Sequence, residues 1–429
     1  MHEIIHLSLG PQANHVNGQF YDLQSNYFVY TDEEAANSLV DPSVRFVAGK
    51  EYTPRAGFWD FRGGFGKRLR YNSNYEPHQT AEELGEQVER LQVLDDVKIQ
   101  HADLYWAANL KFPLHPKQQF ELLDWEFDPI EAPYGKPRGS PQNESANSFM
   151  TFAQGQDQYN VVDTEFHHEY LDSTVRRLFE QCDNLSGINI LTDFTGWGGF
   201  TVGLLEPLRD DFSQKVPVFS WASGAWSLKT QFRAIIDSYL ETVLGLTEFS
   251  DLVIPLKLDR GSSFAENAEK INLLFETVGV VSSLRKNRVS MATVVQDLTI
   301  GSNANIVTGT TNYQDLVPTD LSGEKVESKT GFLRPSTTLS PSQQTSLWDQ
   351  NLNPQRLVEN GTYAHRIHKH YVPQSRSAPD SYLYAELSLN DGIKKLQNLV
   401  GFNHDLKVRV LDLVENYRWG YESDSDEIE

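Results

Sequence analysis

The stretch over residues 164–208 constrains the fold most, because it predicts a helix, a strand, a glycine-rich loop and a second helix in direct succession. Thr164 is a candidate N-cap for a helix over residues 165–182, whose apolar residues recur on one face. Residues 188–191 form a short apolar strand, and residues 195–199 form the loop before the second helix. This order is typical of doubly wound α/β folds, in which such a loop presents backbone amides to an anion.

The beginning of the chain predicts the opening strand and helix of the same kind of fold. Ile4, Ile5, Leu7 and Leu9 form a short apolar run that fits a buried strand over residues 4–9, and Gly10-Pro11 ends it. Apolar residues at helical spacing begin after Asn14. Further helices are predicted over residues 80–94, 230–244, 265–277 and most of 383–414, and a further strand over residues 252–258.

A chain of 429 residues suggests two or three domains, at roughly 100–200 residues each. We divide it into four predicted parts by their composition and pattern. These are a Rossmann-type N-terminal domain over 1–215 with a surface insertion at about 126–147, a smaller α/β intermediate domain over 216–380 with a long loop at 322–346, a helical region over 381–420, and an acidic tail over 421–429.

Composition excludes several classes of protein. The chain has 59 acidic and 37 basic residues, and the net charge of −22 argues against direct nucleic-acid binding, which needs a basic face. Cys182 is the single cysteine, so no disulfide can form within the chain, and a small core residue is a better interpretation of it than a nucleophile. No apolar run approaches the roughly 18 residues of a membrane span, and the N-terminus has no leader-like segment. We therefore expect an intracellular protein.

Two glycine-rich segments are candidates for anion binding. In residues 195–199 the glycines would allow close backbone approach to a phosphate, but the segment is not a P-loop and Trp197 is a bulky residue at its centre. A plain strand-to-helix turn is the alternative. The segment from Arg62 to Lys67 has a cation at each end and is equally compatible with an anion site or a flexible turn.

Acidic residues and histidines offer weaker candidates. Asp60 and Asp193 would share a magnesium ion if their loops met at one sheet edge, but acids near loops are common and we expect no metal site. His365 and His368 could share a helical face, yet the cations beside them favour a solvated basic patch. A surface pair is the better interpretation of His167-His168.

Three segments resemble tubulin in the same order along the chain. Residues 1–7 read M-H-E-I-I-H-L, and with Gly10 and Asn14 they resemble the start of tubulin, M-R-E-I-V-H-I-x-x-G-Q-C-G-N. Residues 53–60, T-P-R-A-G-F-W-D, are similar to P-R-A-V-x-V-D-L-E-P. Residues 180–187, E-Q-C-D-N-L-S-G, resemble the D-Q-C-T-G-L-Q-G that precedes the G-G-G-T-G-S-G loop of tubulin.

Two further segments resemble a narrower group, the Misato family of tubulin-like proteins. Residues 105–117 contain Y-W, L-K and L-H-P-K in the order of the block W-S-D-[FY]-L-K-x-x-L-H-P-[KR]. Residues 182–193 follow its C-D-x-L-x-G-x-x-I-L-x-D pattern. The resemblance is strong over residues 1–212 and diffuse afterwards. It implies a tubulin-like α/β fold, and a role in partitioning mitochondria and inheriting mitochondrial DNA.

The resemblance also implies where a nucleotide would bind and why its hydrolysis would fail. Pro11 and Gln12 replace the glutamine and cysteine that contact nucleotide in tubulin, Arg62 replaces a glutamate, and the glycine loop is shorter. A cation cannot orient a water molecule as a carboxylate does, so we expect no enzyme activity, no catalytic residue and no required cofactor. Weak GTP binding stays open because Arg62 and Lys67 could attract phosphate. The degenerate pocket would consist of Gly10, Gln12, Asn14, Asp60, Gly196, Gly198 and Gly199.

Three functions follow as hypotheses. The first is a non-enzymatic tubulin homologue that supports mitochondrial distribution through protein partners, peripherally at the mitochondrial outer surface and in the cytoplasm. The second is an active GTPase that polymerises as tubulin does. The third is a cytosolic factor linked to the chaperonin and to tubulin assembly, as animal members of the family are. The acidic tail over 421–429 could bind a basic partner or simply add solubility.

Overall fold

The computed structural model describes most of the first 312 residues and parts of the remainder. The described residues are 2–28, 40–49, 52–66, 104–108, 110–140, 148–166, 171–212, 215–224, 233–258, 261–286, 288–299, 304–312, 357–359, 362–367, 383–388 and 403–419.

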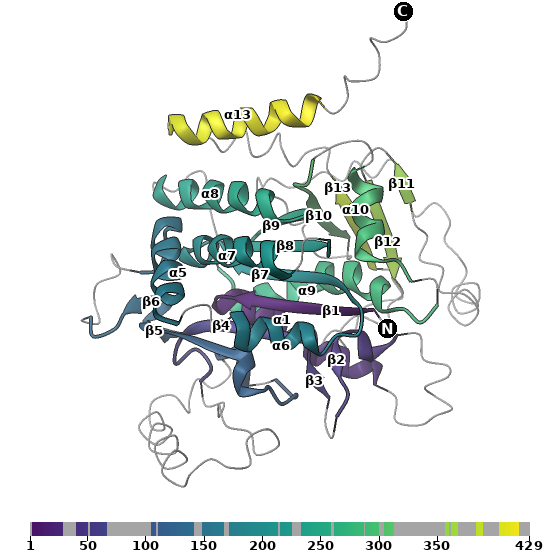
Figure 1. Ribbon diagram of the computed structural model, residues 1–429, viewed down its shortest axis with the longest axis horizontal. Helices are drawn as coiled ribbons and strands as arrows, with labels where there is room; N and C mark the ends of the chain where they lie inside the picture. Colours follow the sequence, from purple (N-terminus) through teal and green to yellow (C-terminus); the bar gives the residue numbers. More distant parts are fainter. Residues whose placement is uncertain are drawn as a thin grey trace, which may run out of the picture.

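A seven-stranded sheet forms the centre of the molecule, in the order β6-β5-β4-β1-β7-β8-β9 (Figure 1). Neighbouring strands are parallel except for β5 and β6, which form an antiparallel hairpin at one edge. The strands are β1 (Glu3–Leu9), β4 (Ala56–Arg62), β5 (Gln119–Asp128), β6 (Ala132–Pro137), β7 (Leu185–Asp193), β8 (Val218–Gly224) and β9 (Leu252–Lys257).

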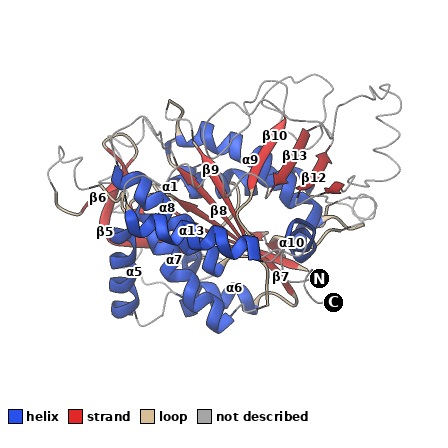
Figure 2. Ribbon diagram, turned by 90° about the horizontal axis from the view of Figure 1, so that it is seen from above, coloured by secondary structure: helices blue, strands red, loops and turns tan. Residues whose placement is uncertain are grey.

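Helices cover both faces of this sheet (Figure 2). One face carries α5 (Phe152–Phe166), α6 (Arg177–Glu180), α7 (Gly196–Pro207), α8 (Arg233–Phe249) and α13 (His404–Trp419), and the other carries α1 (Pro11–Gln24), α9 (Phe264–Val280) and α10 (Met291–Thr299).

Both faces of β1 are buried. Ile5 and Leu7 lie in the core under α7 and α8, whereas Ile4 lies in the core under α1 and α9. His6 and Ser8 are also buried, and both make hydrogen bonds to side chains of α1. The strand predicted over residues 4–9 and the α/β class are thus confirmed.

A second, antiparallel sheet has the order β10-β13-β12-β11 and continues from β9. Val253 of β9 donates its N–H to the carbonyl of Asn305 at 2.8 Å, and its own carbonyl accepts the N–H of Val307 at 2.9 Å. A two-stranded sheet completes the described strands. The strands of these sheets are β10 (Thr308–Asn312), β11 (Leu357–Glu359), β12 (Thr362–Ile367) and β13 (Leu383–Ser388), with β2 (Phe46–Val47) and β3 (Thr53–Pro54) in the smaller sheet.

Several local predictions are confirmed within a few residues. The helices predicted over 230–244 and 265–277 are α8 and α9, and the strand predicted over 252–258 is β9. The helix predicted from Asn14 begins earlier, at Pro11, because proline is favoured in the first turn of a helix.

Other local predictions are wrong. Thr164 does not cap a helix but lies inside α5. The described part of the helix predicted over 165–182 begins as a π-helical turn at Leu171–Arg176 and continues as α6. Residues 383–388 form β13 rather than a helix. Much of the insertion predicted at about 126–147 belongs to the sheet as the end of β5 and β6. His365 lies in β12, so it shares no helical face with His368.

Some predictions fall outside the described residues, and the domain limits stay a prediction. The predictions outside the described residues are the helix over 80–94, the loop over 322–346, the tail over 421–429, Lys67, and the pair His167-His168.

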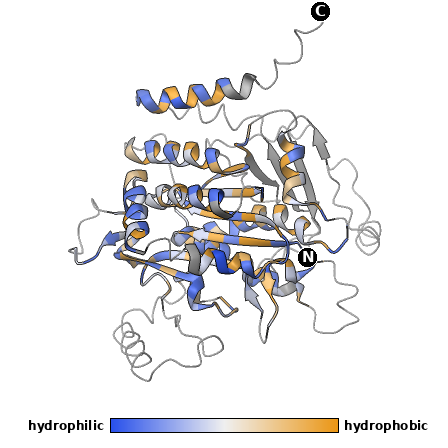
Figure 3. Cartoon of the chain, in the orientation of Figure 1, coloured by the Kyte–Doolittle hydropathy of each residue, from blue (hydrophilic) through white to orange (hydrophobic). Residues whose placement is uncertain are grey.

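The helix α13 lies across α8 at the top of the view in Figure 1. Apolar and hydrophilic residues alternate along it (Figure 3). Leu406 and Val410 are buried, whereas Val408 and Leu411 are 42% and 44% exposed. Among the described residues, no helix has both the length and the apolar character needed to cross a membrane.

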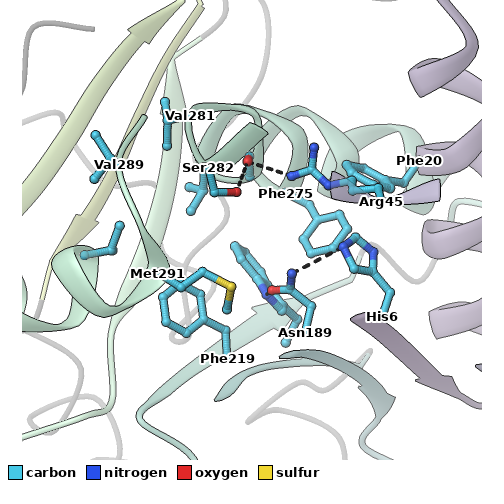
Figure 4. Close-up of a pocket in the computed structure, with 14 residues that line it drawn as sticks. His6, Phe20, Arg45, Asn189, Phe219, Phe275, Val281, Ser282, Val289 and Met291 are labelled. Carbon is cyan, nitrogen blue, oxygen red and sulfur yellow. Dashed lines mark hydrogen bonds between the residues drawn. The ribbon is translucent and has the colours of Figure 1, made fainter. Parts of the chain in front are cut away.

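A buried arginine ties α1 to α9. Arg45 is 2% exposed and donates to the carbonyl of Gly279 at 2.6 Å and to the side-chain oxygen of Gln24 at 3.3 Å. Figure 4 shows its guanidinium beside Phe20, whose ring centre lies 5.0 Å away, next to a cavity of about 10 Å³. That volume holds about one water molecule, so this cavity is a packing defect rather than a ligand pocket.

The carboxyl group of Glu276 lies in the same buried network. It accepts hydrogen bonds from the Tyr27 hydroxyl at 2.6 Å and from the Gln24 amide at 3.3 Å. Burial raises the pKa of Glu276 to about 7, although these bonds and the nearby Arg45 oppose the shift. The folded state therefore holds this proton more tightly than the unfolded chain does.

We predict that Glu276→Gln flattens the pH dependence of stability. A carboxyl group whose pKa rises on folding stabilises fully below its unfolded pKa, near 4.5, and this contribution is lost as pH rises towards 7. The loss amounts to about 3 kcal/mol, at about 1.4 kcal/mol per pH unit. Urea denaturation should show that the free energy of unfolding decreases less between pH 4.5 and pH 7.5 in the variant than in wild type. The exposed Glu415→Gln is the control, and equal decreases in all three proteins would contradict the prediction.

Candidate functional site

Three parallel strands bring the predicted pocket residues to one edge of the sheet. The chain leaves β1 through Gly10 and enters α1, Asp60 lies near the end of β4, and Asp193 is the last residue of β7. Because the carboxyl ends of parallel strands meet at the same edge, this is where α/β folds bind ligands. Gly10, Gln12, Asn14 and Asp60 are brought together as the sequence predicted, and their binding of a nucleotide stays a prediction.

The N-terminus of α1 is occupied by a carboxylate of the chain itself. Asp193 accepts the backbone N–H of Gln12 at 3.0 Å and that of Ala13 at 2.8 Å, one on each oxygen. The residue is 5% exposed, and burial raises its pKa to about 8, with a smaller contribution in the same direction from the charge of Asp60. A phosphate at this helix start would need the same two amides, so it would have to displace Asp193.

The side chain of Asn14 also makes its hydrogen bonds within the chain. Its amide nitrogen donates to the carbonyl of Trp59 and to a carboxylate oxygen of Asp60, both at 2.9 Å. Its oxygen accepts the hydroxyl of Ser8 at 2.7 Å. The three bonds use both amide hydrogens and the oxygen of Asn14, so the side chain has little left to offer a ligand.

Asp60 is held by one residue that sequence reasoning missed. Besides Asn14, it accepts the indole N–H of Trp106 at 2.8 Å and the backbone N–H of Phe61 at 2.8 Å. Burial raises its pKa to about 7. In the sequence, Trp106 stands out only as part of the Misato-like block. A buried indole N–H needs a hydrogen-bond acceptor, and this need is the signal that could have suggested a polar partner for Trp106. The two carboxyl groups serve hydrogen bonding, and no group of three metal-ligating side chains occurs among the described residues.

Trp197 fills the space beside Gly10. Gly10 has φ +107°, and a Cβ there would lie 2.6 Å from an oxygen of Asp193 and 2.8 Å from Cδ1 of Trp197. The indole is fully buried, with ring centres of Phe61, Phe149 and Phe200 at 5.0, 5.7 and 5.6 Å. Trp197 is therefore part of the hydrophobic core, and its place at the position of a phosphate stays a prediction.

The glycines at 196, 198 and 199 form the first turn of α7, so the predicted loop over 195–199 is wrong. A Cβ on Gly199 would lie 2.0 Å from the carbonyl oxygen of Phe152, and one on Gly198 would lie 2.2 Å from the hydroxyl of Thr242. These glycines therefore allow α7 to approach α5 and α8 closely. Their shared role in the described structure is helix packing.

A small cavity remains at this edge. Its lining includes Gln12, whose amide nitrogen donates to the carbonyl of Phe264 at 2.9 Å. The cavity volume is about 40 Å³, enough for about three water molecules. A guanine nucleotide is far larger than three water molecules, so this space alone cannot enclose one.

The remaining candidates show no catalytic arrangement. Arg62 ends β4 and is half-buried. Cys182 is partly buried, donates to the carbonyl of Leu178 at 3.2 Å, and lies 3.6 Å from a guanidinium nitrogen of Arg55. Burial raises the pKa of this thiol to about 11, which opposes a role as a nucleophile.

Two family models match the chain. The Misato Segment II tubulin-like domain matches residues 2–105, and a tubulin domain matches residues 138–282. Similar curated proteins carry the name Protein DML1. The protein from Yarrowia lipolytica is 30% identical to this chain, and the match covers 60% of this chain and 58% of the relative. The protein from Aspergillus niger is 31% identical over 52% of this chain and 47% of the relative. The protein from Aspergillus oryzae is 29% identical over 60% of this chain and 54% of the relative. The matches thus span about half of these relatives, and they confirm the predicted resemblance to the Misato family and the tubulin-like fold.

We predict that Gly199→Ala destabilises the protein more than Gly18→Ala in α1. At position 199 the new Cβ meets the backbone of α5, which cannot move, whereas at position 18 the nearest atom is a ring atom of Trp106 at 3.3 Å. Both variants gain the same helix propensity, about 1 kcal/mol. Gly199→Ala should lower the free energy of unfolding by at least about 2 kcal/mol, measured by urea denaturation. A stable Gly199→Ala protein would contradict the close approach of α5 and α7.

Proposed function

We propose that this chain, a Misato-type tubulin-like protein, acts without catalysis in the partitioning of mitochondria and the inheritance of mitochondrial DNA. It would work through contacts with protein partners. It would be found in the cytoplasm and, peripherally, at the mitochondrial outer surface.

The observation that supports a non-catalytic role best is the occupied helix start. Hydrolysis of GTP needs a phosphate held by backbone amides and a water molecule oriented by a carboxylate. Here Asp193 takes the amides of Gln12 and Ala13, so the two donors that a phosphate would need are already in use. Arg62 stands where the resemblance to tubulin would require a glutamate.

The proposed mitochondrial role is supported by the resemblance to the Misato family. The acidic balance of the chain, 59 acidic against 37 basic residues, favours basic protein partners over nucleic acid. A polymerising GTPase is disfavoured by the occupied helix start and the 40 Å³ cavity. No feature of the described residues favours a chaperonin-linked role over the mitochondrial one.

We predict the following when the gene is repressed in its own host. Mitochondria should be distributed unequally between daughter cells and mitochondrial DNA should be lost, both before microtubules change, as seen by fluorescence microscopy. Re-expression of the wild-type chain should restore both, and an empty vector is the control. Early loss of microtubules, together with co-purification of chaperonin subunits, would contradict the mitochondrial role.

The predicted lack of GTP hydrolysis is tested with the purified chain. The chain should release no phosphate from GTP above the rate in buffer. Phosphate release by wild type that disappears in a folded Asp193→Ala protein would contradict it. Circular dichroism shows whether that variant is folded.

A further inference from the structure

The small cavity at the carboxyl edge of the sheet has aromatic walls. Four elements each supply one ring: Tyr134 from β6, Phe194 after β7, Tyr239 from α8 and Phe264 at the start of α9. The rings of Phe194 and Tyr239 have centres 4.3 Å apart, and those of Tyr134 and Phe264 are 5.9 Å apart. The faces of aromatic rings carry negative charge and attract cations.

The polar side chains that line the cavity are one carboxyl group, one amide and four hydroxyls. Asp193 contributes a carboxylate, and Gln12, which is 2% exposed, has a side-chain oxygen without a hydrogen-bond partner among the described residues. A buried acceptor left without a donor costs free energy until a donor reaches it. The described lining contains no lysine, arginine or histidine. The cavity therefore holds a buried acceptor that has no donor, and its described lining has no positive charge, so a cationic ligand could supply both.

Two helices begin beside the cavity, and helix starts normally attract anions. Each of them already has a carboxylate of its own. Asp193 caps α1, and Glu266 accepts the N–H of Ser263 in a capping box at the start of α9. The starts of both helices thus already have acidic side chains of the chain as hydrogen-bond partners, which leaves fewer amides for an anion.

We propose that this cavity binds the head of an organic cation, an ammonium or a guanidinium group, in the place where a tubulin-like pocket would hold phosphate. A cavity that holds about three water molecules has room for one small head group of this kind. The cation would lie against the aromatic walls and would donate to Gln12 and Asp193. Its source is either a lysine or arginine side chain of a partner protein or a free amine. This binding does not depend on the mitochondrial role proposed above.

The test is a titration of the purified full-length chain labelled with fluorotyrosine and followed by ¹⁹F NMR. The signals of Tyr134 and Tyr239 are assigned with Tyr→Phe variants. The work is done at pH 9, where Asp193, whose pKa is about 8, is mostly ionised. Methylguanidinium should shift both signals in a saturable way, whereas N-methylurea, which has nearly the same shape without the charge, should not.

Tyr134 gives matched variants, because it is 39% exposed and its replacement should leave the fold intact. Tyr134→Leu, followed through Tyr239, should weaken methylguanidinium binding at least fivefold, and Tyr134→Phe should keep it within twofold of wild type. Equal shifts from methylguanidinium and N-methylurea, equal affinity in the two variants, or saturable shifts from inorganic phosphate or GTP would each overturn the proposal.

A further set of probes separates the two sources. N-acetyl-arginine methylamide and the lysine analogue carry the peptide backbone that a partner side chain would bring. Their binding at an affinity similar to that of methylguanidinium supports a partner side chain. Binding of methylguanidinium and methylammonium, without binding of the two probes that carry a peptide backbone, supports a free amine as the natural ligand. In both cases the cavity is a cation site, and absence of binding by all four probes overturns it.

Discussion

The contact between Asp193 and the start of α1 is the interaction on which the rest of this structure depends. It joins the end of β7 to the first turn of the helix that follows β1, so it fixes the relative position of two central strands. It also requires a glycine at position 10, because a Cβ there would collide with the carboxylate and with Trp197. One carboxyl group thus holds the sheet edge together and occupies the place of a phosphate.

The glycines of α7 show how a motif suited to a ligand can be used for packing. In a nucleotide-binding loop glycines let backbone amides approach a phosphate. Here Gly199 lets α7 approach the backbone of α5, and Gly198 makes room for Thr242 of α8. Together with the buried Trp197, they turn the region into part of the hydrophobic core.

Elements with clean periodicity could be predicted from the sequence, whereas long-range contacts could not. The strand over residues 4–9 was recognised because its apolar residues form a short run between a polar start and a glycine. The helix α9 was recognised because its apolar residues recur on one helix face. The loop predicted over residues 195–199 was wrong because close packing against α5 stabilises a helical turn that glycine alone disfavours. The bond between Trp106 and Asp60 joins residues 46 positions apart, and no local spacing shows it.

The most direct test of the occupied helix start is hydrogen exchange at the amides of Gln12 and Ala13, measured by NMR with and without GTP. Both amides donate to Asp193, so we expect them to exchange as slowly as the amides of the central strands and to be unaffected by GTP. Fast exchange at both amides that becomes slow when GTP is added would show that they are free to hold a phosphate, and it would contradict the account.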